Sequence, residues 1–386
     1  MTVSNVLVTG GNGFIAVHII SLLLQHGHAV TTTVRSESKI THLRNTFSAA
    51  VGSGQLKFAI VKDIAIQGAF DRVVKDNSFD AIMHTCSPLI FGDHDVEKET
   101  LQPAIKGTGE ILRSAKEHGP TIKRIIITSS FAAYVNFSNA HDHVYTEKDW
   151  NPITYEFALN NPQLAYYASK TLAEKGAWEF IEREKPGFDL VTIAPTRTYG
   201  PVLHEVTSLN NLNDSSVEFY KVFSGQDKEL NPSRIWLWVD VRDVAIAHVA
   251  ALEKPEAGGH RFLLAEGTFN LGQVAEYIWT HYPERAKAKG IPRSTPTSGY
   301  PPEGVYTADT SAAKTILGTP TSGYPPEGVY TADTSAAKTI LGIEYIKFDD
   351  MLKDQLAQFV TLEKELEGTR QTIPRFIQME NFVESH

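Results

Sequence analysis

The sequence has little cysteine, no excess of basic residues and no long apolar run. Cys86 is the single cysteine of 386 residues, so no disulfide can form within the chain, which fits a reducing compartment. Acidic residues outnumber basic ones by 45 to 36, a net charge of −9, which argues against binding to nucleic-acid backbones. The early apolar run from Phe14 to Leu24 is too short to cross a bilayer, and no basic segment precedes it. A cytoplasmic globular protein with no membrane association is therefore expected.

Short apolar and β-branched runs alternate with helical patterns through the first half of the chain. Strands are expected near 6–9, 29–34, 58–61, 81–84, 124–128 and 189–194. Helices are expected near 14–26, 37–48, 66–76, 97–118 and 162–184. This alternation predicts an α/β fold with a doubly wound parallel sheet of the Rossmann type.

The rhythm becomes irregular after residue 195. We predict a dinucleotide-binding Rossmann domain over 1–195 and a smaller, discontinuous C-terminal substrate-binding region over 196–386, some segments of which return to the Rossmann core. Strands are expected there near 235–239 and 260–264, and helices near 241–253, 270–281 and 349–366.

A tandem duplication interrupts this second region. Residues 295–318 are repeated at all 24 positions in residues 319–342. A solenoid needs about three or more diverged units, which two identical copies do not provide. The duplication is either a doubled lid or, as we favour, one redundant copy. We expect one copy to dock in the native groove and the other to bulge into solvent.

The strongest local motif is a glycine-rich turn directly after the first strand. Residues 9–16 read TGGNGFIA and open the first expected helix. Gly10 permits a tight turn, and Gly13 allows the backbone to approach a pyrophosphate at the helix N-terminus. The turn therefore predicts a dinucleotide site.

The end of the second strand indicates which dinucleotide binds. A pocket for NAD usually carries an acid there for the ribose 2′-hydroxyl. Here Arg35 and Lys39 could bracket a 2′-phosphate instead, with Glu37 facing solvent. We expect NADPH as the cofactor.

Other cofactor contacts are expected at the carboxyl ends of the following strands, where ligands bind in open α/β sheets. Asp63 and Ile64 follow the third strand and should flank the adenine. Thr85 and Ser87 follow the fourth strand and should line the phosphates and ribose.

A serine, a tyrosine and a lysine supply the groups that carbonyl reduction needs. Ser130 follows the fifth strand, while Tyr166 and Lys170 are four residues apart and share one face of the next long helix. Hydride transfer to a carbonyl carbon leaves negative charge on oxygen, which must be stabilised and protonated. We expect Ser130 to orient the carbonyl, Tyr166 to donate the proton, and the Lys170 ammonium to lower the tyrosine pKa.

These residues together resemble the extended short-chain dehydrogenases/reductases, and within them the fungal NADPH-dependent aldehyde and ketone reductases of the methylglyoxal/isovaleraldehyde type. Dihydroflavonol reductases are more distant relatives. The markers that carry the resemblance in order are TGGNGFIA at 9–16, VRSESK at 34–39, HTCSP at 84–88, TSSFAA at 128–133, YYASKTLAEKGAWEF at 166–180, YGP at 199–201 and VDVRDVAIAH at 239–248.

The resemblance implies reduction of aldehydes, ketones or α-dicarbonyls to alcohols, with Ser130, Tyr166 and Lys170 as the catalytic set. It implies further cofactor contacts by Phe14, Ile15 and Pro195, and a substrate pocket lined by Leu89, Phe91, Phe131 and Arg197. Many reductases of this fold have a proton-relay asparagine where this chain has Lys106. At Arg197, related reductases often have an uncharged or aromatic residue. Arg197 could therefore favour carboxylate- or dicarbonyl-bearing substrates, or form a structural salt bridge.

Two rival functions remain open at this point. The same fold could serve an NAD(P)-dependent hydroxysteroid dehydrogenase or sugar epimerase, or a sensor that binds NADPH without chemistry. No metal is expected, because neither His26 and His28 nor His141 and His143 have a completing set of nearby ligands in the sequence. A small-molecule carbonyl is the expected partner, and a monomer and a homodimer both fit.

Overall fold

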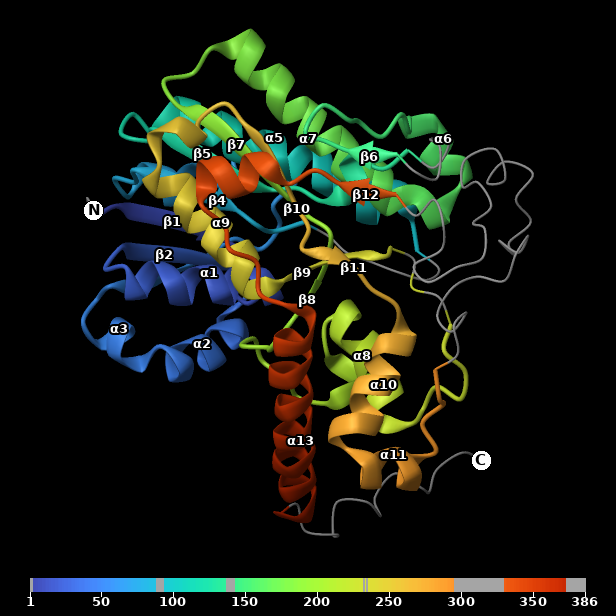
Figure 1. Cartoon of the computed structure of the whole chain (residues 1–386). Coiled ribbons are helices and arrows are strands. Elements are labelled where there is room, and N and C mark those ends of the chain that lie inside the picture. The colour runs from blue at the N-terminus through green and yellow to red at the C-terminus, as the bar shows by residue number, and fades with distance from the viewer. Residues whose placement is uncertain are drawn as a thin grey trace, which may run out of the picture.

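A seven-stranded parallel sheet forms the centre of the computed structural model, which describes residues 3–87, 94–136, 143–231, 233, 235–294 and 330–372 (Figure 1). Its strands, in spatial order, are β10 (Arg261–Leu264), β7 (Asp189–Pro195), β5 (Arg124–Thr128), β4 (Ala81–His84), β1 (Asn5–Thr9), β2 (Ala29–Val34) and β3 (Leu56–Ile60). The order reverses between β1 and β4, which creates the crevice where ligands bind in doubly wound sheets. The predicted Rossmann fold is confirmed.

Helices cover both faces of this sheet, so its strands read as continuous apolar runs. On one face α1 (Phe14–Gln25) packs beside α9 (Val241–Glu253), and on the other α5 (Gln102–His118) packs beside α7 (Ala165–Glu184). Val8, Ile126 and Ile193 are fully buried beneath the first helix pair. Leu7, Ile82 and Ile125 are equally buried beneath the second. Every central strand therefore loses both of its faces to the core.

A second hydrophobic cluster lies beside the sheet and belongs to the C-terminal half. Its helices are α8 (Asp214–Ser224), α10 (Leu271–His281), α11 (Pro283–Lys289) and α13 (Phe348–Thr372). They pack near a small sheet of β8 (Arg197–Tyr199), β9 (Leu237–Asp240) and β11 (Gly267–Thr268). Trp238 is fully buried in this cluster. One later strand, β10, returns to the main sheet, as predicted for some segments of this half. The division of the chain into two domains at residue 195 stays a prediction.

Three predicted helices differ from the observed ones. The pattern near 37–48 divides into η1 (Glu37–Lys39), α2 (Ile40–Thr46) and α3 (Ser48–Gly52), because Phe47 leaves helical geometry at ψ 38°. Only α4 (Asp71–Lys75) forms within 66–76. The pattern near 97–118 begins with the π-helix η2 (Val96–Leu101), and α5 follows it with Pro103 in its first turn, where a missing N–H costs nothing. Unpredicted short elements include α6 (Tyr155–Asn160), β6 (Val144–Tyr145) and β12 (Thr331–Ala332).

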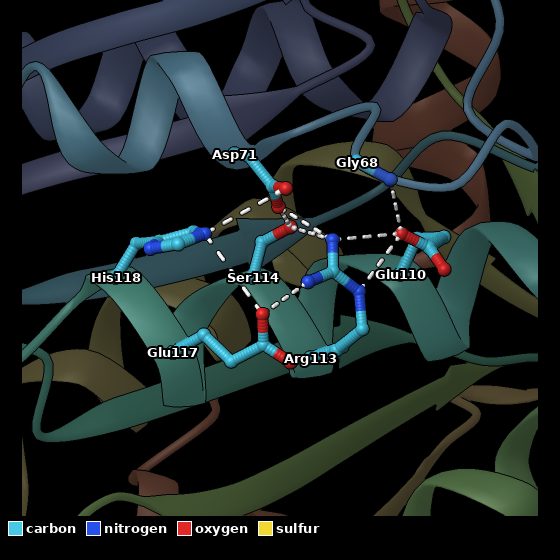
Figure 2. A network of polar contacts seen from close by, with 7 residues as sticks. All are labelled: Gly68, Asp71, Glu110, Arg113, Ser114, Glu117 and His118. Atoms are coloured by element: carbon cyan, nitrogen blue, oxygen red, sulfur yellow. Dashed lines mark hydrogen bonds and ion pairs between the residues drawn. The ribbon is translucent and has the colours of Figure 1, made fainter.

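Arg113 ties α5 to the segment that follows β3 (Figure 2). Its guanidinium contacts Asp71 at 2.5 Å, Glu110 at 3.1 Å and Glu117 at 2.5 Å. Glu110 in turn accepts the Gly68 N–H at 2.8 Å. Close by, a Cβ on Gly107 would lie 2.7 Å from Ile64, so α5 packs directly on the loop predicted to flank the adenine.

The described part of the second repeat copy is docked. β12 pairs in parallel with β6, while Ala337 and Leu341 are buried in the core next to α9. Tyr330 stacks on Trp236 at 5.9 Å between ring centroids and lies 5.7 Å from Phe131. The first copy and the start of the second lie outside the described residues.

Deletion of one copy should therefore leave the fold intact. Because the copies are identical, removing 295–318 or 319–342 yields the same 362-residue chain, and the docked segment is kept. Loop closure changes by only about 0.6 kcal/mol per doubling of loop length, so the melting temperature should move by no more than a few degrees. Thermal unfolding followed by circular dichroism tests this. A fall of about 10 °C or more would show that both copies support the fold.

Candidate active site

A continuous cleft of about 950 Å³ runs along the carboxyl ends of the sheet strands. At its centre the backbone turns from β1 into α1. Gly10 has φ +72°, and a Cβ there would lie 2.7 Å from Cys86; one on Gly11 would lie 1.9 Å from Thr32. Gly13 begins α1 without any side-chain cap, so the free N–H groups of the first helical turn face the cleft near Phe14 and Ile15. This turn fits a pyrophosphate.

One end of the cleft is basic. Arg35, Ser36 and Lys39 line it after β2, and Arg35 and Lys39 are exposed and hence accessible to an anion. Glu37 is exposed and does not line the cleft, as predicted. Lys62 joins this end from the segment after β3, a contribution that sequence analysis missed. Three cations therefore line the end of the cleft where a 2′-phosphate is predicted.

The predicted residues at the next strand ends also line the cleft. Asp63 and Ile64 lie after β3, and Thr85 and Ser87 lie after β4. The Thr85 hydroxyl donates to the Thr9 carbonyl at 2.5 Å, which fixes this strand end against the glycine turn. Pro195 lines the cleft at the end of β7. All of them line the cleft, and their contacts with the cofactor stay predictions.

Ser130, Tyr166 and Lys170 all line the cleft. Ser130 follows β5, and its Oγ accepts the Ala132 N–H at 3.2 Å as the cap of η3 (Phe131–Ala133). Burial raises the pKa of Tyr166, while hydrogen bonding to Ser130 and the positive charge of Arg197 act in the opposite direction. The phenol is therefore protonated near neutral pH, as a proton donor must be.

Lys170 is held at the end of β5. Its Nζ donates to the backbone carbonyl of Thr128 at 3.3 Å, and burial lowers its pKa to about 8. The lowering of the tyrosine pKa by this ammonium stays a prediction.

Behind Lys170, a buried histidine fixes the strand end. The His248 Nδ1 contacts the Val244 carbonyl at 2.7 Å and must therefore carry a proton, since a carbonyl only accepts. Burial lowers the His248 pKa to about 4, so the ring is neutral and its Nε2 accepts the Thr128 hydroxyl at 2.7 Å. The carbonyl that holds Lys170 belongs to this anchored residue.

Glu174, one helical turn after Lys170, is the centre of a second buried network. Its carboxylate accepts from the Ser129 hydroxyl, from Thr192 Oγ1 at 2.8 Å and from Arg261 Nε at 2.7 Å. The Arg261 guanidinium lies 3.5 Å from the Trp150 ring centroid. Only 1% of the Glu174 side chain is exposed. The network therefore holds Ser129, the residue that precedes Ser130. Nothing in the sequence pattern had identified Glu174 as its centre.

Glu174→Ala should lower the free energy of unfolding by about 3–5 kcal/mol, because it leaves the buried Arg261 without its counter-ion. Urea denaturation measures this. Glu182→Ala, at an exposed carboxylate on the same helix, is the control and should change stability by no more than about 0.5 kcal/mol. Equal effects of the two variants would contradict a structural role for the network.

The substrate end of the cleft holds two of the four predicted pocket residues. Phe131 and Arg197 line it, whereas Leu89 and Phe91 lie outside the described residues. Arg197 is paired with Asp214 at 2.5 Å and with Glu218 at 3.0 Å, so the salt-bridge alternative is the observed one. Lys106 is exposed and does not line the cleft. Sequence analysis missed Glu99, Gln163, Tyr167, Asn213, Asp214 and Ile235, which also line it.

One histidine–carboxylate group outside the cleft has the composition of a metal site. His26 and His28 both contact Glu253, at 2.8 and 3.1 Å. However, His28 Nδ1 accepts the Ser4 N–H at 3.1 Å, so its Nε2 must carry the proton and donate to Glu253. A protonated Nε2 cannot bind a metal, and the geometry is that of a hydrogen-bonded pair. The prediction that no metal is required stays a prediction.

Comparisons with known proteins show which proteins this chain resembles. Residues 6–272 match the model of the NAD dependent epimerase/dehydratase family. A ketoreductase, azaE, of Aspergillus niger is 42% identical over 81% of this chain and 92% of its own length. The NADPH-dependent methylglyoxal reductase GRE2 of Saccharomyces cerevisiae is 33% identical over 81% and 93%. The crystal structure of yeast methylglyoxal/isovaleraldehyde reductase Gre2 complexed with NADPH superposes with a TM-score of 0.80 at 29% identity, covering 93% of this chain and 99% of that one.

Proposed function

This chain belongs to the NAD-dependent epimerase/dehydratase family, and from that premise we propose that it is an NADPH-dependent carbonyl reductase. It reduces aldehydes, ketones or α-dicarbonyls to alcohols. The observation that carries the proposal is the joint presence in one cleft of a basic end and of Ser130, Tyr166 and Lys170. The resemblance to NADPH-dependent fungal reductases supports it.

Different residues of the cleft bind different parts of the cofactor. The turn from Gly10 to Gly13 binds the pyrophosphate, because it brings the free N–H groups of α1 to the cleft. Arg35 and Lys39 bind the 2′-phosphate by charge-assisted contacts. Asp63 and Ile64 flank the adenine. When bound, NADPH supplies the hydride.

The chain's own catalytic groups act on the carbonyl oxygen. Ser130 donates a hydrogen bond to that oxygen and orients it, and Tyr166 transfers its phenolic proton to it as negative charge develops. Lys170, held by the anchored Thr128 carbonyl, places a positive charge next to the reacting groups when it is protonated. Its pKa of about 8 means that this charge is present at neutral pH and is lost as the pH rises through that value.

Three further expectations belong to the same proposal. The cofactor is bound mainly by residues 1–195, and residues 196–386 mainly shape the substrate pocket. The protein works in the cytoplasm, as a monomer or a homodimer. No described helix combines the length and apolar character that a membrane span requires.

Initial rates with NADPH and NADH against methylglyoxal, an α-keto ester and an aryl ketone test the proposal. We expect turnover with NADPH, a clear preference for it over NADH, and a ranking of carbonyls that begins to define the pocket. Binding of NADPH by the folded protein without turnover of any carbonyl would favour a sensor. Co-purification of tightly held NAD would favour an epimerase.

A further inference from the structure

The substrate end of the cleft contains a charge cluster in which acids outnumber the arginine. Arg197 on β8 lies against the first two turns of α8. Its Nη1 contacts Asp214 at 2.5 Å, and its Nε and Nη2 contact Glu218 at 3.2 and 3.0 Å. Asp214 and Glu218 are four residues apart and therefore share one face of the helix. All three nitrogens of the guanidinium therefore contact carboxylates on this one helical face.

The arrangement around Arg197 is rigid. Tyr199, two residues further along β8, also donates to Glu218 at 2.6 Å, and its ring stacks on Phe219 at 4.0 Å. The Ser215 hydroxyl donates to the Thr198 carbonyl at 2.5 Å. The strand and the helix are thus joined at three consecutive strand residues, Arg197, Thr198 and Tyr199. Arg197 cannot turn toward a ligand without breaking its contacts with both carboxylates.

The cluster carries a net charge of −1, since one guanidinium faces two carboxylates. Asp214 lines the cleft together with Arg197, and Glu99 adds another carboxylate to the lining. Both Arg197 and Asp214 influence the pKa of Tyr166, which shows that they lie within electrostatic reach of the reacting phenol. Among the described lining residues, Arg35, Lys39 and Lys62 line the opposite, cofactor end, and the Lys170 ammonium donates to the Thr128 carbonyl beside the reacting groups.

We propose that Asp214 determines substrate charge specificity: by occupying Arg197, it makes the substrate end of the cleft select uncharged carbonyls and reject carboxylate-bearing ones. The inference rests on the proposed reductase function and narrows its substrate class to neutral compounds such as α-keto esters and uncharged dicarbonyls. An α-keto acid would bring its carboxylate toward the cluster of Arg197, Asp214 and Glu218, which also carries a net negative charge. If the substrate carboxylate lies about 8 Å from one net negative charge, at an effective dielectric constant of about 20, their repulsion corresponds to a factor of about 30 in kcat/KM.

A matched pair of substrates tests the proposal: ethyl benzoylformate and benzoylformate share the aryl α-keto group and differ in charge. With saturating NADPH, kcat/KM should be about 30-fold or more higher for the ester. In Asp214→Asn the net charge of the cluster changes from −1 to zero, and Nη1 of Arg197 becomes available to a substrate carboxylate. The ester-to-acid ratio should therefore fall by about tenfold. Asp214→Glu, which keeps the charge, should keep the ratio well above that of the Asn variant.

The unaltered protein offers an independent readout that needs no variant to fold. Raising ionic strength screens exposed charges, so the ester-to-acid ratio should narrow as salt is added. A ratio near one in the unaltered protein, or the same ratio in Asp214→Asn, would overturn the inference and leave the reductase function standing. If the folded protein reduces neither of these two compounds nor any other carbonyl, the proposed function is overturned, and the inference with it.

Discussion

Tyr166→Phe should reduce turnover of every carbonyl substrate by about 1,000-fold, because it removes the group that protonates the developing alkoxide. The loss should appear in kcat, since the phenol acts on charge that develops in the transition state. NADPH binding should change little, because the ring and its packing remain. Steady-state kinetics and titration of NADPH fluorescence measure the two effects separately.

Tyr155→Phe is the matched control for this loss. Its hydroxyl hydrogen-bonds Gln102 and Glu97, and the residue does not line the cleft. The control should retain turnover within about threefold. Normal turnover in Tyr166→Phe would contradict the mechanism, because another group would then have to supply the proton.

The Arg35→Ala/Lys39→Ala double variant should lose most of the preference for NADPH. Contacts of charged groups with a phosphate are each worth about 1.5–3 kcal/mol, but both side chains are exposed and screened by solvent. We therefore expect kcat/KM for NADPH to fall by about 100-fold in total. The value for NADH should change much less, since NADH has no 2′-phosphate. Initial rates with both cofactors at one ionic strength measure the ratio.

Lys57→Ala controls for the loss of positive charge. Lys57 is exposed on the edge strand β3 and does not line the cleft. Its removal should leave the cofactor ratio within about twofold. An unchanged preference for NADPH in the double variant would mean that Lys62 or another group selects the cofactor.

The sequence was most informative where one local pattern determines the structure. The turn at 9–16 was predicted because a strand, glycines and a helix start follow one another within eight residues. Burial of both sheet faces gave the continuous apolar runs from which β1, β2, β4 and β5 were predicted. The strand ends then placed Ser130, Thr85 and Asp63 at the cleft, since parallel strands end on the same edge.

Groups brought together by tertiary packing were harder to predict. Arg197 was left with two interpretations, because its partners lie 17 and 21 residues further along on α8, a helix that the irregular pattern near 200–232 did not reveal. The i, i+4 spacing of Asp214 and Glu218 after a capping asparagine was the available signal. Glu174 was equally hidden: its partners are Ser129 just after β5, Thr192 in the middle of β7 and Arg261 at the start of β10, and only the fold makes them neighbours.

Ionisation was the property that local spacing predicted least well. The four-residue separation of Tyr166 and Lys170 placed both side chains in the cleft, as expected. It did not reveal that Lys170 would donate to Thr128 or that burial would raise the Tyr166 pKa. Both effects depend on how deeply this helix is buried by the rest of the fold, and the spacing of two residues along one helix gives no information about that burial.

Deuterium transfer from NADPH labelled at both C4 hydrogens to an α-keto ester tests the central claim most directly. The account predicts one alcohol per NADPH consumed, with a single deuterium on the new carbinol carbon, seen by mass spectrometry and proton NMR. It also predicts that Tyr166→Phe abolishes this product while still binding the cofactor. A folded protein that binds NADPH yet forms no labelled alcohol from any carbonyl would contradict the account.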